Sequence, residues 1–74
     1  MISSALTPST RRALRVSAGM TLAQVAAQIG VVETTVFGWD HYGVTPRSFE
    51  HRVAYEALLS QWAAQLTSNL ERAS

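Results

Sequence analysis

Apolar positions recur every three or four residues along most of this chain, without the alternation typical of strands, and they predict an all-α fold. Thr7 and Pro8 have the cap-then-proline order of a helix start. A first helix is therefore expected over about residues 8–18, ended by Gly19. Residues 1–6 show no clear period and are expected to be frayed.

A second helix is predicted directly after Thr21. Thr21 and Gln24 have the spacing of a capping box, in which each side chain bonds the backbone N–H of the other residue. One apolar face follows at helical spacing, formed by Leu22, Val25, Ala26 and Ile29. Gly30 is expected to end this helix.

A third, short helix is predicted over residues 33–40, and a long one over residues 47–72. The start of the third helix lacks a good cap, because Val32 has no side-chain acceptor for the free amides. A loop is expected over residues 41–45. Thr45-Pro46 then repeats the earlier cap-then-proline order, and no breaker follows for about 25 residues.

Residues 22–40 have the residue types that a helix-turn-helix requires. Two short helices that cross steeply need a small residue at the crossing, which Ala26 supplies, and a residue tolerant of positive φ at the turn, which Gly30 supplies. Apolar groups must also hold both helices against the rest of the domain. These are Val25, Ile29, Val31, Val36 and Trp39.

The chain from about Leu6 to Arg52 resembles the DNA-binding domain of the XRE, or lambda-repressor/Cro-like, family. The resemblance is carried, in order, by Leu14-Arg15, Gly19-Met20-Thr21, Val25-Ala26, Ile29-Gly30-Val31 and Thr35-Val36-Phe37-Gly38-Trp39-Asp40. It implies a lambda-repressor-like helix-turn-helix bundle of about four helices, the last one long. The C-terminal part of that last helix lies outside the resemblance.

The resemblance also implies that residues 33–39 form a recognition helix in the major groove of double-stranded DNA. By position, it assigns base contacts to Glu33, Thr34, Phe37 and Gly38. The phosphate contacts expected beside them are Arg15, Thr21, Thr35, His41 and Arg47.

Two kinds of departure from the family change the expected chemistry. Leu22 stands where glutamine is common and Val32 where serine is usual, and the recognition helix lacks the arginine or lysine that the family often has. Base contacts would then come from Glu33, which can accept from a cytosine amino group, and from Phe37 and the Thr34 methyl, which can contact thymine methyls. Two alternatives remain open: Glu33 as a complement to the helix dipole alone, and Phe37 as part of a protein interface.

The long last helix carries an apolar stripe at three- and four-residue steps. The stripe can fold back over the first helix, a use that suits Leu58 and Trp62. It can also join two copies of the chain, a use that suits its far end. The dimer contact is assigned to Leu59, Trp62, Leu66 and Leu70. Such a dimer would place two recognition helices on half-sites roughly 34 Å apart.

Composition excludes several classes of protein. Without cysteine there is no disulfide or thiolate zinc site, and His41 and His51 have no third ligand at useful spacing, so no metal or other cofactor is expected. No catalytic set is apparent, and 74 residues in one domain (1–74) leave little room for a substrate pocket, so neither enzyme activity nor a small-molecule ligand is expected. No apolar run approaches the roughly 20 residues of a membrane span, and a cytoplasmic location in a bacterial cell or phage-infected host is expected.

These observations predict a sequence-specific transcriptional regulator, such as a small phage Cro-like repressor that occupies a pseudo-palindromic operator as a homodimer. The net charge of only +1 is weak for a DNA-binding protein. The alternative is a helix-turn-helix protein–protein interaction module, antirepressor- or antitoxin-like, with weak or no DNA binding. If Arg15, Arg47 and Arg52 share the face of Glu33 and Phe37, DNA binding is favoured, whereas a face dominated by acidic residues favours a protein partner.

Overall fold

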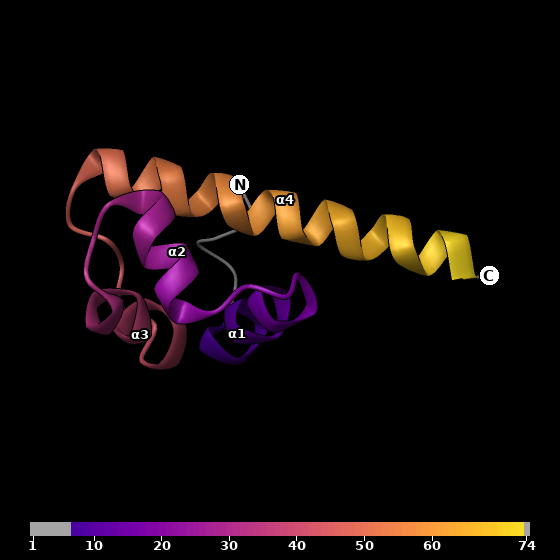
Figure 1. Ribbon diagram of the computed structural model, residues 1–74, viewed down its shortest axis with the longest axis horizontal. Helices are drawn as coiled ribbons and strands as arrows, with labels where there is room; N and C mark the ends of the chain where they lie inside the picture. Colours follow the sequence, from indigo (N-terminus) through magenta and orange to yellow (C-terminus); the bar gives the residue numbers. More distant parts are fainter. Residues whose placement is uncertain (1–6, 74) are drawn as a thin grey trace.

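The computed structural model describes residues 7–73, which form four α-helices (Figure 1). In chain order these are α1 (Pro8–Ser17), α2 (Leu22–Ile29), α3 (Glu33–His41) and α4 (Phe49–Ala73). The predicted all-α fold with a long last helix is confirmed. The segment predicted to be frayed, residues 1–6, lies outside the described residues.

Local capping sets the starts of α1 and α2 as predicted. The Thr10 N–H donates to the Thr7 hydroxyl at 3.2 Å. In the capping box, the Gln24 N–H donates to the Thr21 hydroxyl at 3.1 Å, and the Thr21 N–H donates to the Gln24 side chain at 2.9 Å. Gly30 ends α2 in the left-handed conformation, with φ of +92°.

The start of α4 differs from the prediction. The helix begins at Phe49 rather than at residue 47, because Pro46 is buried in the connecting loop instead of opening the first turn. Ser48 supplies the cap: its hydroxyl accepts from the His51 N–H at 3.4 Å. A serine cap therefore replaces the predicted threonine-proline start.

The core lies between α4 and the three short helices. Trp39 of α3 and Tyr55 of α4 pack with ring centroids 4.9 Å apart, and α4 lies along one side of the molecule with its C-terminal part projecting past α1 (Figure 1). The buried apolar side chains are Leu14, Val25, Ala26, Val36, Trp39, Tyr55, Leu58, Leu59 and Trp62. Within the described residues, no helix has both the length and the apolar content that crossing a membrane requires.

Candidate nucleic-acid interface

The α2–α3 pair is joined by a tight turn centred on Gly30. The N–H groups of Gly30 and Val31 both donate to the Ala26 carbonyl, at 2.8 and 3.0 Å. Ala26 itself is buried, and α2 packs against α3. These features match the small residue and the turn glycine that the sequence pattern predicts for a helix-turn-helix. The turn leaves α3 at the surface of the molecule, held from one side only.

Two faces of α3 differ sharply in exposure. Val36, Trp39 and Asp40 are buried, so they define the inner face. Glu33 and Thr34 are exposed. The outward face is formed by the four residues that the sequence predicts for base contact, Glu33, Thr34, Phe37 and Gly38. The structure thus brings these four together on one side of α3, while base contact itself remains a prediction.

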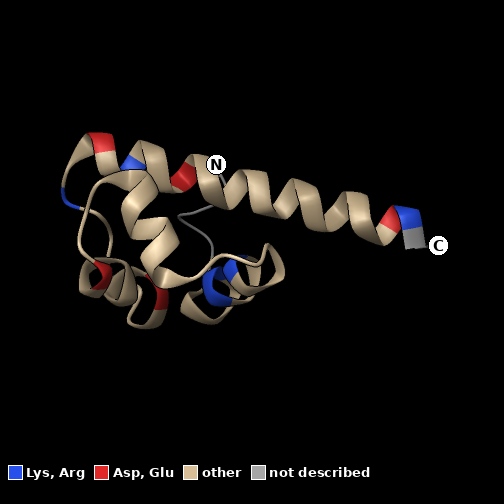
Figure 2. Cartoon of the chain, in the orientation of Figure 1, with Lys and Arg blue, Asp and Glu red and all other residues tan. Residues whose placement is uncertain are grey.

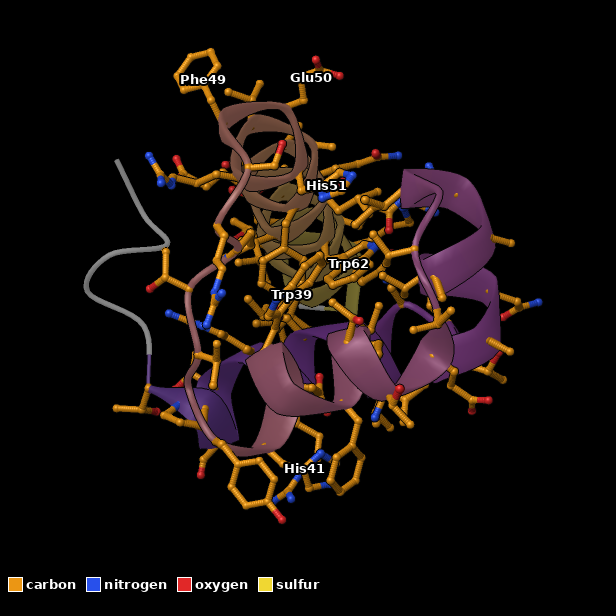
Figure 3. The ribbon with its side chains drawn as sticks, turned by 90° about the vertical axis from the view of Figure 1, so that its left-hand side faces the viewer. Trp39, His41, Phe49, Glu50, His51 and Trp62 are labelled. Atoms are coloured by element: carbon orange, nitrogen blue, oxygen red, sulfur yellow. The ribbon has the colours of Figure 1, made fainter. Side chains whose placement is uncertain are left out.

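Three aromatic rings lie together at the C-terminal end of α3; we call Phe37, His41 and Tyr42 the aromatic corner. The rings of Phe37 and His41 are stacked, with centroids 4.0 Å apart and an interplanar angle of 19°. Tyr42 meets Phe37 edge-on at 5.7 Å. Figure 3 shows His41 on the outside of the molecule, whereas Trp39 points into the core. No local sequence pattern indicates Tyr42, because it lies just beyond the end of α3 and outside its helical spacing.

Arg15 has a different role from the phosphate contact predicted for it. Its Nε and Nη2 lie 3.1 and 3.3 Å from the two carboxylate oxygens of Asp40, and its Nη1 donates to the Met20 carbonyl at 2.8 Å. Asp40 is only 1% exposed. Because this bidentate pair uses both ends of the guanidinium inside the molecule, the prediction is corrected: Arg15 fastens α1 to α3.

The other four predicted phosphate contacts differ in their exposure and in the partners that they already have. The Thr21 hydroxyl serves as the α2 cap, and Thr35 is half-buried. His41 turns Nδ1 toward Asp40, 3.3 Å from Oδ2. Arg47 is exposed on the loop after α3, where it lines a shallow surface hollow of about 460 Å³ together with Thr34 and Gly38. Arg47 is therefore the predicted cation that the fold does place beside the outward face of α3.

Charge around α3 is mixed. Figure 2 shows acidic positions on α3 and arginines on the neighbouring α1. Of these arginines, Arg11 is buried and donates to the Trp39 carbonyl at 3.3 Å, whereas Arg12 is exposed. Arg52 is half-buried on α4. The cations open to solvent near α3 are thus Arg12 and Arg47, so charge alone does not separate a nucleic acid from a protein partner.

Part of the predicted dimer contact is wrong. Leu59 is 0% exposed and Trp62 is 4% exposed, because α4 packs its apolar stripe directly over the short helices. Neither side chain is open to a second copy. Leu66 is half-buried and Leu70 is 64% exposed, so only the far end of the stripe remains available.

Among the described residues, no group of three histidine or acidic side chains lies close enough to hold a metal ion. No family model, curated protein or solved structure matches the chain. Roles for α3 therefore rest on the residues and contacts of this chain.

Proposed function

We propose that the chain is a double-stranded DNA-binding regulator in which α2 and α3 form a helix-turn-helix of the XRE type, and that it represses transcription by occupying an operator. The observation that carries the proposal is the division of α3 into two faces. Its inner face is fastened to the core and its outward face is left open by the fold. The residues on this outward face are Glu33, Thr34 and Phe37, which are exposed, and Gly38, which is half-buried.

The dimensions and the ends of α3 support this proposal. α3 has nine residues, and an α-helix with its side chains is about 10 to 12 Å across, which fits a major groove about 12 Å wide. No side chain caps the N-terminus of α3 at Val32. The Thr35 N–H donates to the Val32 carbonyl at 3.1 Å, which leaves the N–H groups of Glu33 and Thr34 for a phosphate. Arg47 supplies positive charge beside the outward face of α3, and Arg12 is exposed on the neighbouring α1.

A protein-binding module is the second candidate function, and the aromatic corner favours it. Aromatic side chains are enriched in protein interfaces, and Glu33 on the same face would repel phosphate. DNA binding remains the stronger proposal, because the turn at Gly30 and the two-faced α3 are the geometry that places a helix in the major groove.

A dimer is part of the proposal. Two copies joined through the projecting end of α4, where Leu66 and Leu70 lie, would bind two half-sites of a pseudo-palindromic operator. Each copy alone offers few cations, so the second copy would add affinity without a new type of contact.

The test is selection of bound duplexes from a random pool, followed by comparison of two charge-matched variants. Thr34→Asp adds one negative charge to the outward face of α3, and Ser60→Asp adds the same charge on the exposed side of α4. We expect Thr34→Asp to weaken binding to the selected duplex at least tenfold and Ser60→Asp to leave it nearly unchanged. Equal binding by both variants, or no enriched duplex, would contradict the proposal.

A further inference from the structure

The aromatic corner assigns a chemical class to the bases that α3 contacts. We infer that Phe37, held by its neighbours, recognises the C5-methyl group of a pyrimidine in the major groove, either thymine or 5-methylcytosine. This inference rests on the proposed function, because it needs α3 to lie in the groove.

Phe37 packs against neighbouring rings in the free chain. Phe37 is 36% exposed, and its ring stacks on that of His41 with centroids 4.0 Å apart. His41 in turn faces the buried Asp40 carboxylate at 3.3 Å, and Arg15 holds that carboxylate from α1. The contacts Arg15–Asp40–His41–Phe37 thus connect the first helix to the outward face of α3. A side chain that is already ordered loses little conformational entropy on binding, so its apolar contact is available for recognition.

The chemistry of the outward face narrows the choice of base. It has no arginine or lysine, so the bidentate contact to guanine that such side chains make is missing. It offers a phenyl ring and a carboxylate instead. A methyl group at pyrimidine C5 is the apolar feature of the major groove, and a phenyl ring contacts it well.

Glu33 places an acceptor on the same face, one helical turn before Phe37. Four residues of helix rise about 6 Å, close to two base-pair steps of about 3.4 Å each. The carboxylate can accept from a cytosine amino group there. The expected site is therefore a cytosine within about two base pairs of a C5-methylated pyrimidine.

Phe49 is a natural control for Phe37. It is more exposed, at 73%, and lies at the start of α4, on the opposite side of the molecule from His41 (Figure 3). Among the described residues it has no ring contact comparable to the Phe37–His41 stack. Replacing it removes the same side chain without touching the outward face of α3.

The test uses the duplex enriched by selection and changes only methyl groups. In one set of duplexes each thymine is replaced in turn by uracil, and in the other each cytosine by 5-methylcytosine. We expect one thymine position to lose about fourfold in affinity as uracil, or one cytosine position to gain about fourfold on methylation, as burial of one methyl group predicts. The first result identifies thymine as the source of the methyl group, and the second identifies 5-methylcytosine.

The variants assign the effect to Phe37. Phe37→Ala should abolish the dependence of affinity on the methyl group, whereas the control Phe49→Ala should keep it. Phe37→Leu retains apolar bulk and should keep part of the dependence, so it replaces the alanine variant if that variant fails to fold. Binding that ignores the methyl group at every position overturns the inference while leaving DNA binding intact. A methyl effect that survives in Phe37→Ala also overturns it. Absence of any enriched duplex overturns the proposed function itself.

Discussion

Asp40 lies almost completely buried at the end of α3, and Arg15 of α1 neutralises it through a bidentate ion pair. Removing the arginine would leave a buried carboxylate without its guanidinium partner, beside the His41 imidazole alone. We expect Arg15→Ala to lower the free energy of unfolding by about 3 kcal/mol, measured by urea denaturation. The exposed neighbour Arg12→Ala should stay within about 0.5 kcal/mol of the wild type. Equal losses for the two variants would contradict a structural role for Arg15.

Burial of Tyr55 makes the free energy of unfolding fall as the pH rises above 10. Burial raises the pKa of its hydroxyl to about 12 from the usual value of 10.0, and the nearby positive charge of Arg11 partly opposes this. Below pH 10 the hydroxyl keeps its proton in both the folded and the unfolded chain. Between pH 10 and about 12 only the unfolded chain releases it, so the stability present at lower pH is lost across this window.

We expect the free energy of unfolding to fall by about 2 to 3 kcal/mol from pH 10 to pH 12, as a shift of about two pKa units predicts. Urea denaturation at a series of pH values measures this, and Tyr55→Phe should remove most of the dependence. An equally steep fall in Tyr55→Phe would assign the effect to another group.

At the scale of helices and turns, substitution by alanine is expected to change the stability of the fold in opposite directions at two glycines. Gly30 has φ of +92° and open space around an added Cβ, so Gly30→Ala costs backbone strain alone, about 1 to 2 kcal/mol. Gly38 lies inside α3, where an added Cβ meets only Val44 Cγ2 at 4.0 Å. Gly38→Ala should therefore stabilise the fold by up to about 1 kcal/mol. Thermal unfolding of both variants measures the difference, and changes of the same sign would contradict the assigned conformations.

Helix starts were predictable from sequence where the cap is local. The cap at Thr7 and the capping box at Thr21 involve partners three residues away, and both are present. The start of α4 was not, because Thr45-Pro46 shows the same local signal and only the burial of Pro46 in the folded chain overrides it. Local chemistry decides such a boundary only when the tertiary fold does not compete.

The outward face of α3 could be predicted from the sequence, whereas the tertiary contacts that surround it could not. The outward side of α3 follows from helical spacing once the inner residues are known. The partner of Arg15 lies 25 residues away in sequence, which no local pattern indicates. The burial of Leu59 and Trp62 likewise depends on how α4 lies over the short helices, so an apolar stripe alone did not distinguish core from dimer contact.

At the scale of the whole molecule, the projecting end of α4 is the part that a second copy would cover (Figure 1). Leu70 is 64% exposed there, so Leu70→Gln should leave the unfolding midpoint nearly unchanged. Sedimentation velocity should show a concentration-dependent dimer, and Leu70→Gln should weaken that dimer at least threefold. The control is Val53→Gln, at a position that is 51% exposed on the part of α4 away from the projecting end, and it should not weaken the dimer. A wild type that is monomeric both free and on DNA would contradict the dimer.

The central claim is that α3 binds duplex DNA and that only a few arginines of each chain neutralise phosphates. The direct measurement is fluorescence anisotropy of a labelled mixed-sequence duplex, with salt stepped from about 50 to 200 mM. If Arg12 and Arg47 neutralise two phosphates per chain, affinity should fall about tenfold over this range, and further if two copies bind together. Absence of binding at 50 mM by a protein that circular dichroism shows to be helical would contradict the account and leave the aromatic corner as a surface for a protein partner.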